Sequence, residues 1–386
     1  MSAAHSRLAK ILSQPTSPFR EGCVLSVCEE ILLAEKIPHF RDPANNIVVG
    51  VKSKTEYLKL VKAKSTEPVR IFIAHTDHPG FHGLEWETAD RLKFKWYGGS
   101  PTLHLEGGKV WLADSEGFVG EGRVEKAVLM SHGKAIDHGV IHVKDLQRQT
   151  RAGDLFGGFG FRAPHWREGD LLYTKAADDL IGVYAILETA IALKKAKKKA
   201  PFLGLLTRAE EVGFIGAIAH FELGWLKIAK RKIIAVSLET SRTLPGAEIG
   251  KGPVVRLGDR RSVFDSGATQ VFSELATRAL AGKHQRRIMD GGTCEGTAAT
   301  VYGIPTIAIS VPLGNYHNQS FEGGPDAAPS NGPAPEFVSV SDIEGMCILT
   351  QAVMTAKLPW HQPFAGARVE FKKSLKTYRK LLQSGP

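Results

Sequence analysis

The segment Ala74–Phe81 reads A-H-T-D-H-P-G-F and places a histidine and an aspartate two residues apart at the end of an apolar run. That run, Val69–Ala74, has the composition of a buried β-strand. Residues i and i+2 of a strand share a face, so His75 and Asp77 are expected to point the same way from the strand's carboxyl end. An imidazole binds a metal best when its second ring nitrogen donates to a carboxylate or a carbonyl. A lone His-x-Asp occurs often by chance, so the prediction of a metal ligand depends on further ligands downstream.

Two pairs of adjacent acids lie at similar places. Asp178 and Asp179 stand where a helical pattern begins, and an acidic N-cap is the alternative to metal binding there. Glu210 and Glu211 follow the strand-like run Pro201–Thr207, where a solvated acidic loop is the alternative. Such a pair also suits a division of labour, in which one carboxylate binds metal and its neighbour holds the proton of a metal-bound water.

An acid and a histidine complete the set. Glu239 ends the apolar run Ile233–Thr240, where packing explains a glutamate poorly. His317 lies in a loop after the strand-like part of Gly303–Asn318, although a loop histidine is usually a solvated polar residue. Ligands in α/β folds converge at the carboxyl ends of strands. Two histidines and three carboxylates, one of them bridging, suit a pair of Zn²⁺ or Co²⁺ ions about 3.5–4 Å apart.

The chain resembles the glutamyl aminopeptidase and tetrahedral (TET) aminopeptidase family of co-catalytic di-zinc peptidases. The similarity extends over nearly the whole chain. The matching segments are Asp42–Gly50, Ala74–Phe81, Ala177–Gly182, Glu210–Ala217, Gly291–Thr293 and Gly303–Thr306.

The resemblance implies two metal sites that share one bridging carboxylate. One site would be formed by His75, Asp178 and Glu239, and the other by Asp178, Glu211 and His317. It further implies that Glu210 is the general base and acid and that Asp77 orients His75. Asp178 is taken as the bridging acid because it is the first of the Asp pair when the motif is aligned on Gly182.

Four positions depart from the family pattern. Glu239 stands where the family usually has aspartate, and this change keeps an oxygen ligand. Leu180 replaces the arginine after the Asp pair. The segment Gly314–Asn318 replaces Arg-Tyr-x-His-Ser, and Cys294 replaces the aspartate of Gly-Gly-Thr-Asp. The last three lie where substrate is expected, so they bear on specificity.

Composition fits a large enzyme with room for a core and a smaller second domain: the chain has 386 residues, of which 43% are hydrophobic. We expect no membrane as a partner, since no run approaches about 18 apolar residues and the N-terminus lacks the apolar core of a signal peptide. The four scattered cysteines, Cys23, Cys28, Cys294 and Cys347, indicate a reduced, cytoplasmic protein.

The formal net charge of +10 is largely local. Basic residues gather in Lys227–Lys232 and in the helix-like tail Arg368–Lys380. Solvated basic faces are favoured over a nucleic-acid role because aromatic interleaving is sparse. A basic protein that binds anionic polymers is the non-enzyme alternative, but it does not explain acids and histidines gathered at strand ends.

The patterns divide the chain into a discontinuous catalytic domain and an insertion. Alternating strand and helix patterns over 1–83 and 169–362 predict a mixed, mostly parallel sheet flanked by helices. Short glycine-punctuated β-like runs over 84–168 predict an inserted small β-domain, and 363–386 form a basic C-terminal tail. The Pro- and Gly-rich segment 323–336 is expected to be irregular, and Ser341 and Asp342 are expected to cap a closing helix over 343–356.

We expect a metal-dependent aminopeptidase that acts on a peptide or small amide. A carboxypeptidase or an N-acyl amidohydrolase on the same metal site is the alternative within enzymes. The family resemblance also implies a homo-oligomer.

Overall fold

The fold is built around an eight-stranded mixed sheet in a computed structural model that describes residues 3–198 and 200–384. The strand order is β1-β2-β12-β3-β13-β16-β14-β15. In that order the strands are β1 (His39–Arg41), β2 (Ile47–Val49), β12 (Phe202–Thr207), β3 (Val69–His75), β13 (Ile233–Arg242), β16 (Thr306–Leu313), β14 (Val254–Asp259) and β15 (Gln285–Met289).

The four central strands of the sheet, β12, β3, β13 and β16, pair in parallel. Each is an almost continuous run of buried residues, because helices cover both faces of the sheet. Within β3, Phe72 and Ala74 enter one hydrophobic core, whereas Ile71 and Ile73 enter the core on the other face. The parallel centre brings the carboxyl ends of these strands to one edge of the sheet.

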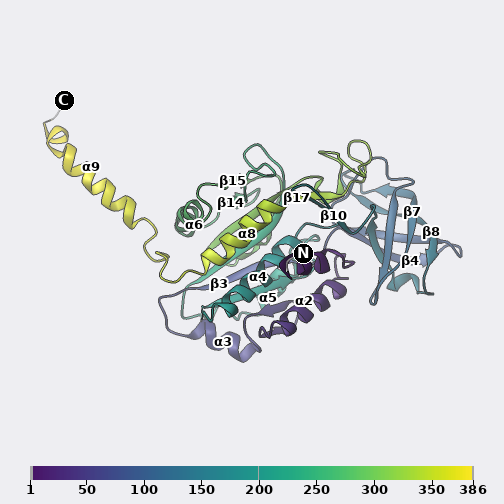
Figure 1. Cartoon of the computed structure of the whole chain (residues 1–386), viewed down its shortest axis with the longest axis horizontal. Coiled ribbons are helices and arrows are strands. Elements are labelled where there is room, and N and C mark those ends of the chain that lie inside the picture. Colours follow the sequence, from purple (N-terminus) through teal and green to yellow (C-terminus); the bar gives the residue numbers. More distant parts are fainter. Residues whose placement is uncertain (1–2, 199, 385–386) are drawn as a thin grey trace.

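In the described part of the chain, eight helices cover the two faces (Figure 1). The first face is covered by α1 (Ala3–Leu12), α2 (Gly22–Ala34), α4 (Leu180–Lys195), α6 (Ser266–Ala279) and α8 (Val340–Val353). The second face is covered by α3 (Lys54–Lys62), α5 (Ile215–Glu222) and α7 (Glu295–Val301). A further helix, α9 (Ala365–Gln383), extends away from the body (Figure 1).

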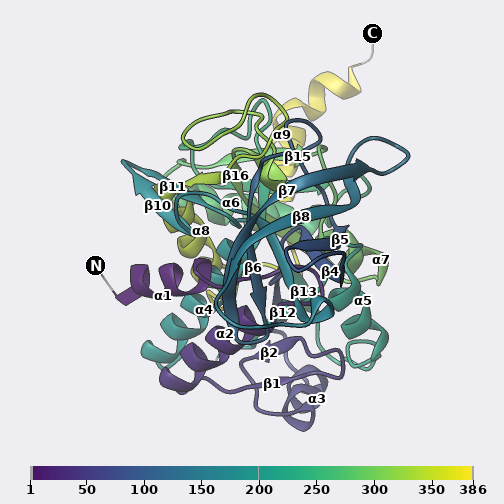
Figure 2. The ribbon, with the colours of Figure 1, turned by 90° about the vertical axis from the view of Figure 1, so that its right-hand side faces the viewer.

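A closed six-stranded barrel is inserted between β3 and α4 and faces the viewer in Figure 2. Its strands follow the order β4-β5-β8-β7-β6-β9. They are β4 (Gly80–Trp86), β5 (Arg91–Tyr97), β8 (Ile136–Leu146), β7 (Gly117–Leu129), β6 (Lys109–Asp114) and β9 (Phe156–Phe159), with a short 3-10 turn η1 (Ala152–Asp154) before β9. Phe81, Phe94, Trp96 and Phe159 fill its interior.

A small three-stranded sheet pairs the two strands that follow the barrel in the chain with a strand near the end of the catalytic core. It consists of β10 (His165–Glu168), β11 (Leu171–Thr174) and β17 (Glu336–Ser339), all antiparallel. The barrel's first strand begins at Gly80, four residues before the expected start of the insertion, and β10 pairs with β11 of the core rather than with the barrel.

The predicted fold class, a mixed and mostly parallel sheet flanked by helices with an inserted small β-domain, is confirmed. The predicted cap of the closing helix is wrong by two residues. Helix α8 begins at Val340, and the Ser339 hydroxyl accepts a hydrogen bond from the Asp342 N–H. Among the described residues, no helix is long and apolar enough to cross a bilayer.

Candidate metal centre

Five separate segments carry the predicted metal ligands to the carboxyl edge of the central strands. His75 is the last residue of β3, and Glu239 lies near the end of β13. Asp178 lies in the turn before α4, Glu211 in the loop after β12, and His317 in the 3-10 turn η2 (Tyr316–Asn318) after β16. Because β3, β12, β13 and β16 are parallel, the segments with His75, Glu211, Glu239 and His317 meet at the same edge. The turn with Asp178 follows β11 of the small antiparallel sheet and reaches the same edge, where Asp178 faces both histidines.

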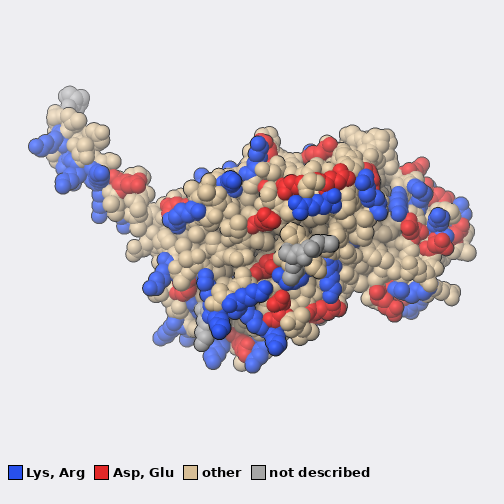
Figure 3. Space-filling model, in the orientation of Figure 1, with Lys and Arg blue, Asp and Glu red and all other residues tan. Residues whose placement is uncertain are grey.

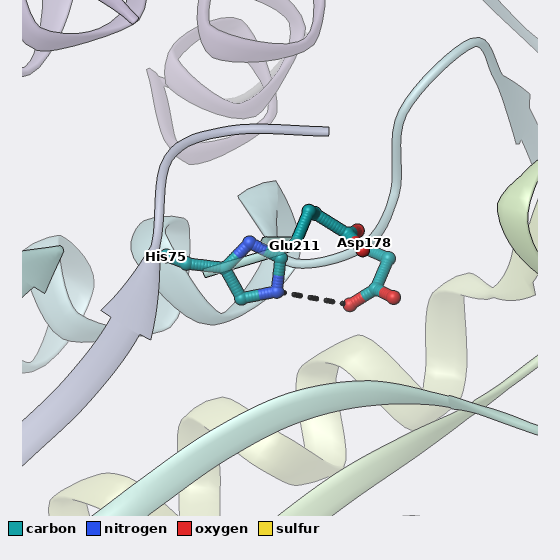
Figure 4. Close-up of side chains that lie close together, drawn as sticks. All are labelled: His75, Asp178 and Glu211. Carbon is teal, nitrogen blue, oxygen red and sulfur yellow. Dashed lines mark ion pairs between the residues drawn. The ribbon is translucent and has the colours of Figure 1, made fainter. Parts of the chain in front are cut away.

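The first cluster surrounds the imidazole of His75. Its Nε2 atom lies 3.3 Å from Oδ1 of Asp178, 3.6 Å from Oε1 of Glu239 and 3.9 Å from Oε2 of Glu210. All four side chains are at most 9% exposed. Figure 4 shows the ring of His75 directed toward Asp178, with Glu211 beside it.

The second cluster surrounds the imidazole of His317. Its Nε2 atom lies 3.1 Å from Oε2 of Glu211 and 3.8 Å from Oδ2 of Asp178. The two carboxylate oxygens of Asp178 therefore face two different histidines, Oδ1 toward His75 and Oδ2 toward His317. This is the arrangement of a carboxylate that bridges two cations.

Three potential metal-ligand atoms of these clusters make no hydrogen bond with the described residues. Oδ1 of Asp178, Oε1 of Glu211 and Nε2 of His317 are buried without a hydrogen bond in the described structure. Ligand atoms of His75, Asp178 and Glu211 lie within 4.8 Å of one another, as do those of His75, Glu210 and Glu239. Buried polar groups are normally paired, and imidazole with carboxylate is a donor set that suits Zn²⁺ and Co²⁺. The residues present therefore fit a bound pair of divalent ions.

The electrostatics of the cluster also favour an added cation. Burial, followed by the nearby charge of Glu239, raises the pKa of Asp178 well above its usual range. Burial likewise raises the pKa of Glu210. Burial opposes protonation of His75, but the surrounding carboxylates, Glu210 first, raise its pKa well above the usual value. A group of carboxylates out of contact with water is stable only when protons or metal ions neutralise it.

Asp77 holds the double-glutamate turn. Its Oδ1 and Oδ2 accept the backbone N–H groups of Glu210 at 3.0 Å and of Glu211 at 3.1 Å. The carboxylate also lies 3.6 Å from Nδ1 of His75, whose closer neighbour at 3.2 Å is the Asp77 backbone carbonyl. Asp77 therefore lies beside Nδ1 of His75, as predicted for the residue that orients this ring. It also holds the backbone of the two glutamates, and the sequence did not predict this second contact.

The adjacent aspartates have different environments. Asp179 is the N-cap of α4, where its Oδ1 accepts the Gly182 N–H at 3.1 Å and the Thr240 hydroxyl at 3.0 Å. Asp178 instead projects between the two histidines. Asp179 therefore caps the helix, whereas Asp178 is the residue of the pair whose two oxygens each face a histidine.

Glu336 is a buried acid that sequence reasoning missed. It is fully buried at the start of β17 and accepts three backbone N–H groups. These belong to Ala177 at 2.7 Å, Asp178 at 3.2 Å and His317 at 2.9 Å. One carboxylate therefore holds both of the loops that carry Asp178 and His317. Its position at the end of the Pro- and Gly-rich segment gave no sequence signal for this role.

The barrel also contacts the site. Gly99, just after β5, lies so close to the His317 ring that a Cβ added at this residue would collide with Nδ1. The Gly99 carbonyl accepts the indole N–H of Trp96 at 2.9 Å, which fixes this backbone. Only glycine fits at this close approach of backbone to ring.

A cleft opens next to the cluster. Its walls include Asp178, Glu210, Glu239, Arg256 and Tyr316. The Arg256 side chain is buried, with Nη1 donating to the Ser241 hydroxyl at 3.0 Å and lying 4.0 Å from Oε2 of Glu239. A substrate in this cleft would reach the face of the cluster that carries Glu210.

Residues 58–321 match the family model described as M42 glutamyl aminopeptidase. The chain belongs to this family. Membership makes it a metal-dependent aminopeptidase that hydrolyses peptides, and it sets aside the alternative of a basic protein that only binds anionic polymers.

Solved structures similar to this aminopeptidase share its fold over almost the whole chain. A TET aminopeptidase from a marine-sediment archaeon of the Thaumarchaeota is 18% identical with a TM-score of 0.72, covering 94% of this chain and 99% of that chain. An aminopeptidase from Desulfurococcus kamchatkensis is 18% identical with a TM-score of 0.71, covering 94% and 98%. The Pyrococcus horikoshii TET1 peptidase is 19% identical with a TM-score of 0.69, covering 92% and 100%.

Proposed function

We propose that this aminopeptidase removes N-terminal residues from peptides with two divalent ions, Zn²⁺ or Co²⁺, held at the carboxyl edge of the sheet. The observation that carries the proposal is the position of Asp178, whose two oxygens face His75 and His317 separately. One ion would be held by His75, Asp178 and Glu239, and the other by Asp178, Glu211 and His317. Asp178 would bridge them.

Glu210 would be the general base and acid. When bound, the two metal ions would lower the pKa of a water molecule and polarise the substrate carbonyl. The Glu210 carboxylate borders the cleft. It lies farther from His75 than the Asp178 and Glu239 oxygens do, so it is the carboxylate of the three best placed to accept a proton. Glu210 would accept the proton of the attacking water and return it to the leaving amine. Asp77 would keep Glu210 and Glu211 in their separate positions through the two backbone hydrogen bonds.

The metal centre would also select the free terminus of the peptide. A neutral α-amino group offers a lone pair that one bound ion could accept, whereas the nitrogen of an acylated amine does not. A carboxypeptidase or an N-acyl amidohydrolase on the same site is the alternative reaction.

A matched substrate panel tests this choice. Amino-acid amides with a free amine and the same amides with an N-acetyl group are compared for release of ammonia and, in the acetylated series, also for release of acetate. We expect hydrolysis of the free series only, abolished by a chelator and restored by Zn²⁺ or Co²⁺. Preferential hydrolysis of the acetyl–nitrogen bond would assign the chain to the deacylases instead.

We further propose the division of the chain into a catalytic domain over 1–83 and 169–362, an insertion over 84–168 and a basic tail over 363–386. A homo-oligomer is proposed because the Pyrococcus horikoshii TET1 peptidase is described as assembling into a tetrahedron or an octahedral shell. Native mass spectrometry tests the assembly, and a monomer would contradict it. The four free cysteines support a reducing, cytoplasmic location.

A further inference from the structure

Helix α9 is an exposed amphipathic helix with an apolar stripe along one side. Phe371, Leu375, Tyr378 and Leu382 follow one another at spacings of four, three and four residues, so they form one stripe. Their exposed fractions lie between 46% and 75%. None of the residues of α9 is buried in the described structure. An apolar stripe of this size on an otherwise unpartnered helix marks an interaction surface.

The remainder of α9 is strongly basic. The helix contains six cations and a single acid, Glu370. The cations are Arg368, Lys372, Lys373, Lys376, Arg379 and Lys380. At about 100° per residue, Lys373, Lys376 and Lys380 fall on the side away from the apolar stripe, and Lys372 lies with the two arginines along one flank of it. This combination, a cationic polar face with Phe, Leu and Tyr on the other, is typical of helices that lie in the interface of an anionic membrane.

The basic surface continues from α9 onto the body. The chain before α9 is fixed to the amino edge of the central sheet, where the Trp360 carbonyl accepts Nζ of Lys232 and His361 donates to the Thr66 carbonyl, both at 2.7 Å. Exposed lysines surround this edge: Lys59, Lys62, Lys64, Lys227 and Lys230. Figure 3 shows Lys and Arg gathered on α9 and on the neighbouring end of the body around α3.

We propose that α9 anchors the enzyme to an anionic lipid surface, with its apolar stripe among the upper acyl chains and its cations at the headgroups. A flat anionic surface can contact both α9 and the lysines of the amino edge, whereas a groove in a partner protein would engage the helix alone. A second copy of α9 is a poor partner, since both helices carry six cations and one acid. Such an anchor would work whichever bond the metal centre hydrolyses.

The placement leaves the catalytic cleft accessible. The metal cluster lies at the carboxyl edge of β3, and α9 leaves from the side of its amino edge, roughly 20 Å away along a seven-residue strand. The sequence predicted no membrane partner because it contains no spanning run, but a helix that lies on the surface needs none.

Vesicle co-sedimentation with the full chain tests the proposal. Phosphatidylcholine vesicles are compared with vesicles that also contain phosphatidylglycerol. The double variant Leu375→Glu/Leu382→Glu introduces two charges into the apolar stripe. The matched control, Ser374→Glu/Thr377→Glu, adds the same charge on the flank of the helix and removes no apolar side chain.

We expect binding to the phosphatidylglycerol vesicles, little binding to phosphatidylcholine alone, and a loss of partitioning of at least about ten-fold in the stripe variant beyond that of the control. Far-UV circular dichroism should show more helix when anionic vesicles are added, because an isolated helix of this length is marginal in water. Peptidase activity should be equal in all variants.

Three results would overturn the anchor. Equal binding by the stripe variant and its control would show simple charge attraction. Failure to bind anionic vesicles would leave an acidic protein partner as the occupant. Dissociation of the oligomer on deletion of residues 364–386, observed by native mass spectrometry, would make α9 a contact between copies of the chain.

Discussion

The two edges of the central sheet carry opposite charge in opposite environments. At the carboxyl edge, the side chains of Asp178, Glu210, Glu211 and Glu239 lie within a few ångströms of two histidines. The backbone N–H groups of Asp178, Glu210 and Glu211 donate hydrogen bonds to the buried carboxylates of Glu336 and Asp77. At the amino edge, the lysines and the cations of α9 are exposed to solvent. Exposed charges are screened and need no defined partner, whereas buried like charges require neutralisation at fixed positions. The first edge is therefore suited to bind ions specifically, and the second to be attracted to any anionic surface.

The largest expected effects at the carboxyl edge come from substitutions of Glu210 and Glu211, which should differ in whether metal is lost. Glu210→Gln should keep both metals and reduce kcat by about 10²–10⁴-fold, since it removes only the proton carrier. Glu211→Gln should lose metal as well as activity, because it removes a ligand. Metal content and kcat are measured on both variants. If Glu210→Gln emptied the site while Glu211→Gln did not, the two roles would be exchanged.

Glu336→Gln should have the next largest effect. An amide side chain keeps one oxygen acceptor but loses the charge and the second acceptor for the three N–H groups that Glu336 holds. Residues that orient ligands typically contribute about 10–100-fold to metal affinity. A competition titration with a fluorescent chelator measures this affinity, with Glu344→Gln on the exposed side of α8 as the matched control. Unchanged affinity in Glu336→Gln would limit its role to the fold.

Gly99→Ala tests whether the barrel takes part in the metal centre. The new methyl group would collide with the His317 ring, so the ring must move. We expect weakened binding of one ion of the two, the one that His317 contacts, while the other stays bound. Gly153→Ala is the control, because a Cβ there meets nothing within 4 Å. Loss of both ions together, or of neither, would contradict this assignment.

The last comparison concerns stability: Lys175 is buried, whereas the lysines of the amino edge are exposed. Burial lowers its pKa to about 7 from the ordinary 10.5, and its Nζ donates to the Gln14 carbonyl. The folded state is therefore disfavoured below the folded pKa, and this penalty disappears as pH rises through about 7 toward 10.5. Lys175→Met should raise the free energy of unfolding by an amount on the order of a few kcal/mol near pH 7.

Denaturant unfolding at several pH values checks this expectation. The difference between Lys175→Met and the wild type should shrink as pH rises from about 7 to about 10. The matched control, Lys372→Met on α9, should show no such trend because Lys372 is exposed. A constant difference across this range would mean that Lys175 is charged in the folded state throughout.

The sequence predicted the residues that the structure brings together because ligand types recur at the carboxyl ends of strands. His75, Glu239, His317 and the two acidic pairs could be named in this way, and the family resemblance selected Asp178 and Glu211 within those pairs. Contacts that join distant segments through backbone groups left no such pattern. Glu336 accepts the N–H group of Ala177, which lies 159 residues earlier in the chain, and Gly99 contacts the ring of His317, which follows the insertion.

Local signals also had limits. Ser339 and Ser341 are equally good caps by type, and the choice of Ser339 follows from the pairing of β17 with β11, which ends at Ser339. The tail was recognised as basic and helix-like, but its apolar stripe could equally have packed on the body. The structure was needed to show that this stripe is exposed.

The bridge that Asp178 is proposed to form between two divalent ions can be tested by counting those ions. Metal content per chain is measured by inductively coupled plasma mass spectrometry, for the wild type and for Asp178→Ala after gel filtration. We predict close to two ions in the wild type and almost none in Asp178→Ala, because the bridging carboxylate serves both sites. Two ions retained by the variant, or a fully active wild type that holds no metal after exhaustive chelation, would contradict the bridge.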